Sequence, residues 1–165
     1  PLRLEADKKI AVVLPESEDL TPADTSSYLK PSLADAIRVH HENVQEYVIP
    51  HHPSTSDIQG VLSQLKDADL VMVGTINACS NLGQALLVNQ ILSTGLPVIA
   101  IALRLPYDLA AYPTAPCFLA TYSIMQPSLK AVVDGIFGKN PISGKLPVSI
   151  PGIHTAGHGV VLAGK

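Results

Sequence analysis

Residues 95–123, GLPVIAIALRLPYDLAAYPTAPCFLATYS, contain the pattern from which the fold is predicted. Two apolar runs, residues 98–103 and 117–122, are each preceded by a proline, and a short polar loop separates them. Runs of this length with little polar alternation are typical of strands buried on both faces, as in a parallel sheet covered by helices. Ligands and partners of such sheets gather at the carboxyl ends of the strands. Arg104 and Asp108 follow one such end, so function is first sought there.

The remainder of the chain alternates strand patterns with helical patterns. Further strands are predicted at residues 9–14, 43–49 and 69–75, and a short last strand at residues 146–150 stays open. Helices are predicted at residues 31–40, 55–68, 81–93 and 127–137. This alternation predicts an α/β three-layer sandwich, in which helices cover both faces of a mostly parallel, doubly wound sheet of about five or six strands.

Local signals support the individual helices. Ser54 and Ser56 are both suitable N-caps for the second helix. In the third helix the spacing places four apolar residues on the core face, and Gly95 ends the helix. Those four residues are Leu82, Leu86, Val88 and Ile91.

Length and composition indicate a single domain over residues 1–165, with a core of about residues 9–160. Charged residues make up only 15% of the chain, against about 25% in a typical soluble domain. A sheet buried on both faces lowers this fraction, and so does a surface that packs against another domain or subunit. Because the chain begins at Pro1 without a methionine, we expect a piece of a longer protein.

Charge and hydropathy argue against two classes of partner. A net charge of −3 without a basic cluster argues against nucleic acid, and the apolar runs fall short of the roughly 20 residues of a membrane span. A soluble protein is therefore expected. Its compartment stays open, with the cytoplasm slightly favoured over secretion. Cys79 and Cys117 have no metal or redox spacing, and they are expected to be buried thiols.

The six histidines do not predict a metal site. Adjacent histidines on a strand or helix point in different directions, so a pair does not chelate by itself. A zinc site needs three or four convergent ligands, and the spacing implies none. We expect these histidines to lie exposed in loops. They are His40, His41, His51, His52, His154 and His158.

The known catalytic and cofactor motifs do not match this chain. The loop at residues 74–83 follows a strand and opens a helix, but it fits neither the dinucleotide fingerprint nor the P-loop. No nucleophile elbow of the G-x-S-x-G kind occurs. Asp108 is the one acidic residue in the loops of the central stretch, where we expect a pair with Arg104 that holds the loop shape. Spacing alone therefore predicts no catalytic residue and no cofactor.

A series of motifs resembles a known family. In order, these are DLVMVGTINA, GQALLVNQIL, GLPVIAIALRLPYDLAAYP, CFLATYS, PSLKAVVDGIFG, and GKLPVSIPG followed by GHG. Together they resemble the C-terminal α/β sandwich domain of glycoside hydrolase family 3, and within it the β-N-acetylglucosaminidases. The resemblance covers about residues 9–160.

The resemblance implies that the chemistry lies outside this chain. In this family a TIM barrel precedes the sandwich and carries the aspartate nucleophile, with an Asp–His pair for acid/base work in the β-N-acetylglucosaminidases. No barrel is present here, and His158 in the GHG triplet is not the barrel's substrate loop. In the β-glucosidase branch the sandwich adds an acid/base glutamate, yet residues 74–138 contain no glutamate. No catalytic residue is therefore carried over, and the chain alone is predicted to be inactive.

The resemblance also implies partners. They are the catalytic barrel of the same protein, an acetyltransferase-like domain that follows in some relatives, and further copies of the chain. Five polar residues that follow strand ends are the candidates for a domain interface or the rim of a cleft: Asn77, Asn81, Arg104, Tyr107 and Asp108. A free-standing module that binds a sugar, and a stand-alone α/β enzyme, stay open as alternatives.

Overall fold

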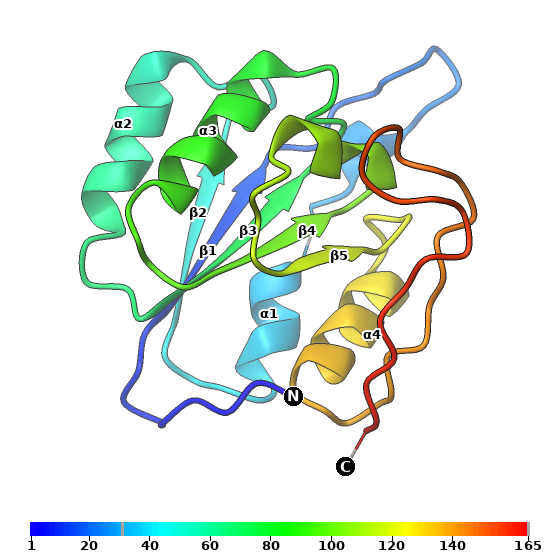
Figure 1. Ribbon diagram of the computed structural model, residues 1–165. Coiled ribbons are helices and arrows are strands. Elements are labelled where there is room, and N and C mark those ends of the chain that lie inside the picture. Colours follow the sequence, from blue (N-terminus) through cyan, green and yellow to red (C-terminus); the bar gives the residue numbers. More distant parts are fainter. Residues whose placement is uncertain (31, 165) are drawn as a thin grey trace.

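The computed structural model describes residues 1–30 and 32–164, and its centre is a five-stranded, wholly parallel sheet (Figure 1). The strands run in the order β2-β1-β3-β4-β5. Their bounds are β1 Ile10–Pro15, β2 Val44–Ile49, β3 Leu70–Thr75, β4 Val98–Ala102 and β5 Phe118–Ala120. The five main predicted strands are confirmed, and so is the doubly wound class.

Four α-helices cover the two faces of the sheet. They are α1 Leu33–Arg38, α2 Thr55–Gln64, α3 Leu82–Leu92 and α4 Gln126–Ile136. Helices α1 and α4 pack together on one face, and α2 and α3 pack together on the other (Figure 1). Two 3-10 helices, η1 Ser26–Tyr28 and η2 Pro106–Ala111, lie in the loops after β1 and β4. The predicted helix start at Pro31 lies outside the described residues.

The core consists of two apolar clusters, one on each side of the sheet. Because successive side chains of a strand point to opposite faces, β3 supplies both clusters. Val71 and Val73 join the cluster under α2 and α3, whereas Leu70 and Met72 join the one under α1 and α4. A strand with apolar residues on both faces is therefore fully buried, as its uninterrupted apolar sequence predicts.

Two helices begin at side-chain caps that fix the start of each helix. Ser54 and Asp57 form a capping box at α2: the Ser54 hydroxyl accepts from the Asp57 N–H at 3.2 Å, and the Asp57 carboxylate accepts from the Ser54 N–H at 2.8 Å. Asn81 caps α3, where its Oδ1 accepts from the Gln84 N–H at 3.2 Å. Of the two predicted caps for α2, Ser54 is the one that the fold uses.

Helix α3 buries a different face from the one predicted. Val88 and Ile91 are buried as expected, but Leu82 and Leu86 are exposed, so their assignment to the core was wrong. The sequence LGQALLVNQIL is apolar around most of the helix, so spacing alone does not select a face. Gln84 is buried instead, because its amide bonds with backbone groups of neighbouring loops.

The tail after α4 forms no strand of the sheet. Among the described residues after 138, only two isolated antiparallel bridges occur, Ile142–Leu162 and Ile150–His154. The open possibility of a strand at residues 146–150 was therefore wrong, because Pro147 inside this segment has no N–H to give to a ladder. Ile150 nevertheless packs into the core under α2 and α3.

The two cysteines lie outside the apolar segments that adjoin them. Cys79 is in the loop after β3 and Cys117 precedes β5 by one residue, and both are exposed. The expectation of buried thiols was wrong, because both residues lie in loops at positions open to solvent. In the described part of the chain, no helix combines the length and the apolar character needed to cross a bilayer.

Candidate functional site at the carboxyl edge of the sheet

All five strands end at the same side of the sheet, so the loops that follow them meet there. We term these loops the carboxyl edge. The chain runs from β1 outward to β2 on one side and then returns to β3 on the other side of β1. In open α/β sheets such a reversal of strand order marks the place where ligands and partners bind. The loops after β1 and β3 are therefore the first place to look for a site.

Asp108 is a fully buried acid at this edge. Its carboxylate accepts hydrogen bonds from Thr75 Oγ1 at 2.6 Å and from the Cys79 N–H at 3.2 Å. Thr75 Oγ1 lies 2.9 Å from the Tyr112 hydroxyl oxygen. Because Thr75 gives its only proton to Asp108, the Tyr112 hydroxyl donates to Thr75. This chain of bonds fastens the loop after β4 to the end of β3 and to the loop after it.

The protonation of Tyr112 suits this arrangement. Burial raises the pKa of its hydroxyl far above the ordinary value of 10.0. The hydroxyl therefore keeps its proton and stays a donor. Both oxygens of the Asp108 carboxylate are in turn occupied by donors of the protein itself, so this acid is not free to act on a substrate.

Arg104 pairs with a distant acid and not with Asp108, so the expected Arg104–Asp108 pair was wrong. Its guanidinium donates to Asp24 Oδ2 at 3.0 Å. Asp24 also accepts from the Leu20 and Ser26 N–H groups, at 3.2 and 2.9 Å. Hydrogen bonds from Ser26 and then from Arg104 hold the pKa of Asp24 well below its ordinary value. The pair joins the loop after β4 to the loop after β1, across the intervening β3.

Asn81 joins the loop after β2 to the start of α3. Its Nδ2 donates to the His51 carbonyl at 2.8 Å and to His52 Nδ1 at 3.0 Å. The orientation of this amide is fixed, because its oxygen must accept from the Gln84 N–H at the helix cap. Gln84 Nε2 donates to the same His51 carbonyl at 2.9 Å. A buried set of amides thus holds the two loops together.

Two residues of the carboxyl edge have a backbone conformation that side chains rarely adopt. Asn77 and Tyr122 both have φ of 59°. Asn enters this region readily, whereas for Tyr it costs about 1–3 kcal/mol. The Asn77 Oδ1 is also buried, and no donor among the described residues reaches it. A buried acceptor of this kind can be satisfied by a water molecule or by a group of a partner.

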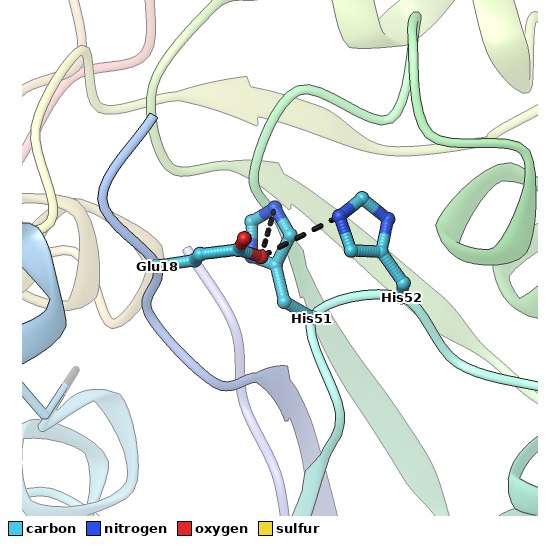
Figure 2. Close-up of side chains that lie close together, drawn as sticks. All are labelled: Glu18, His51 and His52. Atoms are coloured by element: carbon cyan, nitrogen blue, oxygen red, sulfur yellow. Dashed lines mark ion pairs between the residues drawn. The ribbon is translucent and has the colours of Figure 1, made fainter. Parts of the chain in front are cut away.

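Glu18, His51 and His52 bring three potential metal ligands together (Figure 2). One Glu18 carboxylate oxygen, Oε2, lies 3.9 Å from His51 Nε2 and 3.4 Å from His52 Nε2. Glu18 comes from the loop after β1 and the histidines from the loop after β2. The expectation that the histidines lie exposed was wrong for His51, and also for His40 and His41, which are largely buried. An adjacent pair does not chelate alone, but here the fold adds a third group.

A small cavity opens beside this cluster. Its volume is about 190 Å³, below the roughly 300–1,000 Å³ of most small-molecule sites. Loops after β1, β3, β4 and β5 all contribute to it. Its lining residues are Glu18, Ser26, Leu29, Ile76, Arg104, Tyr122, Ser123, Ile124 and Met125.

Large apolar side chains are exposed on the same loops. Tyr28 in the loop after β1 and Leu82 at the start of α3 are both 86% exposed. Four further residues of the carboxyl edge belong to this set, which we term the edge apolar residues: Leu29, Leu105, Tyr122 and Met125. Apolar side chains gathered on one side of a molecule are typical of a surface that packs against a partner.

The five candidate residues thus occupy the carboxyl edge, but in two different ways. Asp108 and Asn81 are buried and bond to other loops, so their side chains hold the edge in shape. Arg104, Asn77 and Tyr107 are partly exposed. A role of any of the five in domain contact stays a prediction.

The sequence did not indicate the partners of these residues. Asp24 and Glu18 lie outside every strand and helix predicted from the sequence, and Thr75 is the last residue of a strand. A polar residue that ends an otherwise apolar strand is the one signal that could have revealed the Thr75 bond.

Comparisons with known proteins agree with this fold. A scan against family models and a search of curated proteins both found no match. Among solved structures, a family 3 β-N-acetylglucosaminidase from a Paenibacillus species matches 89% of this chain at 24% identity, with a TM-score of 0.81. A fungal multi-domain family 3 β-N-acetylglucosaminidase, described as having a GCN5-related glucosamine N-acetyltransferase region, matches 94% of this chain at 26% identity, with a TM-score of 0.77.

A third match is a β-N-acetylglucosaminidase from Thermotoga maritima, with 18% identity over 80% of this chain and a TM-score of 0.52. The present chain spans only 28%, 17% and 27% of these three proteins, so it corresponds to a domain-sized part of each. The likeness confirms the resemblance drawn from the sequence motifs, and the chain is consistent with the C-terminal α/β domain of a family 3 glycoside hydrolase.

Proposed function

We propose that this chain is the non-catalytic α/β domain of a β-N-acetylglucosaminidase of glycoside hydrolase family 3. The parent protein hydrolyses terminal β-N-acetylglucosaminides with retention of configuration, by a two-step mechanism whose catalytic groups lie in a preceding TIM barrel. The domain supports that barrel through its carboxyl edge. The observation that carries this proposal is the match of nearly the whole chain to a small part of each of two β-N-acetylglucosaminidases.

The chemistry of the carboxyl edge favours a non-catalytic role for this domain, as a support for the barrel. Retaining glycosidases use two carboxyl groups about 5–5.5 Å apart that flank the sugar. Here Asp108 is buried and saturated with donors. Asp24 is held as a charged partner of Arg104. Neither acid is therefore placed to protonate a leaving group or to attack a sugar.

The edge apolar residues give this domain a surface suited to a partner. Interfaces are built around exposed aromatic and aliphatic side chains with a polar rim. Tyr28 and Leu82 supply such side chains, and Arg104 and Asn77 supply polar groups on the same loops. The buried Asp108 acts on this surface indirectly, by holding the loop that carries Arg104.

The first test is hydrolysis of a chromogenic N-acetylglucosaminide by the purified 165-residue chain and by the longest natural polypeptide that contains it. We expect turnover only from the longer protein. Turnover by the 165-residue chain itself would overturn the proposal, and Asp108 would then be the first residue to replace.

The second test concerns the surface. In the longer protein, Leu82→Glu is expected to lower the activity and the melting temperature, because it places a charge in the contact with the barrel. Val39→Glu is the matched control, since Val39 is 77% exposed and follows α1 at the opposite end of the sheet. Equal effects of the two variants would argue against docking through the carboxyl edge.

A free-standing sugar-binding module is the second candidate, and the cavity at the carboxyl edge is the observation that favours it. Because the cavity is small, the sugar-binding module is the weaker of the two hypotheses. A ligand that binds only the folded state raises the melting temperature. A rise with N-acetylglucosamine, lost in Arg104→Ala, would favour the module over the supporting domain.

A further inference from the structure

We propose that Glu18, His51 and His52 form a binding site for a divalent transition-metal ion of the Zn²⁺ class. The site lies at the carboxyl edge, where the loop after β1 meets the loop after β2 (Figure 2). It is independent of the catalytic chemistry proposed for the parent protein.

The ligand atoms are almost at the spacing that a tetrahedral ion requires. With metal–ligand distances of about 2.0–2.2 Å, tetrahedral ligands lie about 3.3–3.5 Å apart. The Glu18 carboxylate is 3.4 Å from His52 Nε2 and 3.9 Å from His51 Nε2. All three groups offer ligand atoms within 4.8 Å of one another. Side-chain shifts of about 1 Å, together with the change at His52 described below, therefore complete the site.

His51 is already set in the form that binds a metal. Its Nδ1 lies 3.0 Å from the Glu16 carbonyl oxygen, which can only accept, so Nδ1 carries the proton. In the neutral ring, Nε2 then has a free lone pair, and this lone pair faces the Glu18 carboxylate. Two acceptors that face each other call for a cation between them, and the Glu18 side chain is 49% exposed, so an ion can enter from solvent. A backbone carbonyl behind a ligating histidine is the usual support of a metal site.

His52 is the adaptable ligand. The Asn81 amide donates to its Nδ1, so the neutral ring carries its proton on Nε2 and donates toward Glu18. Binding a metal requires the ring to release Asn81 and move its proton. The side chain of His52 is 71% exposed, so the ring has room to turn once that bond is broken. Asn81 keeps its two other bonds, to the His51 carbonyl and from the Gln84 N–H.

The donor set defines the class of ion. Two imidazoles and one carboxylate suit Zn²⁺, Ni²⁺, Cu²⁺ or Fe²⁺. Ca²⁺ and Mg²⁺ prefer six or more oxygen ligands and are poorly served here. Three protein ligands leave at least one position for water or for a group of a partner.

The experiment is a calorimetric titration of the 165-residue chain with ZnCl₂ in a non-chelating buffer near pH 7.5, repeated with MgCl₂. We expect one equivalent of Zn²⁺ to bind, with a rise in melting temperature, and no response to Mg²⁺. His52→Ala and Glu18→Gln change exposed side chains, so both should fold, and each should weaken the binding at least tenfold. Retention of full affinity in both variants, or an equal response to Mg²⁺, overturns the proposal.

A matched control separates this site from ordinary surface histidines. His154 and His158 stack on each other in the tail, with ring centroids 3.7 Å apart. The double variant His154→Ala/His158→Ala should bind Zn²⁺ like the unchanged chain. Loss of binding in this variant would place the ion at the tail and overturn the proposal. As a second readout, ¹⁵N NMR of the imidazoles should report zinc on His51 Nε2 with the proton kept on Nδ1. An unshifted His51 in the zinc-loaded chain overturns the assignment.

Discussion

Asp108 and Asp134, two buried aspartates at opposite ends of the sheet, accept hydrogen bonds from different kinds of donor. At the carboxyl edge, Asp108 accepts only from uncharged donors, a hydroxyl and an N–H. At the other end, Asp134 of α4 accepts from Lys130 and from His40, whose Nε2 lies 2.9 Å away. Salt screens the attraction between two charged side chains, whereas it screens a hydrogen bond from a hydroxyl or an N–H to a buried carboxylate much less. At the surface proposed for docking, the bonds of Asp108 are therefore expected to be less sensitive to salt than the Arg104–Asp24 pair of the same edge.

The largest expected effect tests the Asp108 side of this comparison. Asp108→Ala removes the acceptor of the part-buried Cys79 N–H and of the buried Thr75 hydroxyl. Unfolding in urea should show a loss of about 2–4 kcal/mol, as is usual when a buried polar network is broken. A loss below about 1 kcal/mol would mean that water reaches this site and that the network is not buried in solution.

Tyr112→Phe should have a smaller effect in the same assay. The change removes the bond to Thr75 but leaves no unpaired donor, because Thr75 still donates to Asp108. The expected loss is about 1 kcal/mol. A loss as large as that of Asp108→Ala would show that the tyrosine hydroxyl, and not the carboxylate, organises the network.

The pH dependence of the stability tests the other end of the sheet, where Asp134 pairs with Lys130 and His40. Hydrogen bonds from Lys130 and then from His40 lower the pKa of Asp134 from its ordinary value of 3.8. The stability gained from this carboxylate is therefore complete above the unfolded-state pKa and is lost as the pH falls through the folded-state pKa. Melting curves of the unchanged chain and Asp134→Asn should converge as the pH falls from 7 to 3. Parallel curves over this range would contradict the assignment.

The smallest effect is expected from Lys130→Gln. The side chain of Lys130 is 67% exposed, so water and salt screen its attraction to Asp134. The melting temperature should change by no more than about 2 °C, and 1 M NaCl should remove the difference. A larger change that survives salt would show that Lys130 acts through packing instead of charge.

Most of the fold could be predicted from the sequence, because most of its strands are short apolar runs and some helix starts carry local cap residues. The strand at residues 69–75 and the Ser54 cap are of this kind. The face of α3 could not be predicted, since Leu82 and Leu86 look as apolar as the residues that are buried. What buries Gln84 instead is a pair of backbone groups from two other loops, and these come near only in the folded chain.

The position of the candidate residues at the carboxyl edge could be predicted from the sequence, but their hydrogen bonds and ion pairs could not. Parallel strands put their following loops at one edge, so Arg104 and Asp108 could be assigned to it from the strand pattern alone. Their partners could not be, because Asp24 is 80 positions from Arg104 and Thr75 is 33 positions from Asp108. The same holds for Glu18 and the two histidines. Spacing in the sequence predicts local geometry only. These contacts form because the order of the strands brings distant loops together.

That strand order also sets when the protein can fold. The first strand of the chain lies inside the sheet, and its Ile10 pairs with Leu70, about 60 positions later. At a synthesis rate of about 5–20 residues per second, β1 waits several seconds on the ribosome before β3 emerges to cover it. During that time the apolar sequence IAVVLP has only the edge strand β2 as a neighbour. The newly made chain is thus most prone to aggregate before residue 75 is available, and closing so long a loop makes the first complete core slow to form.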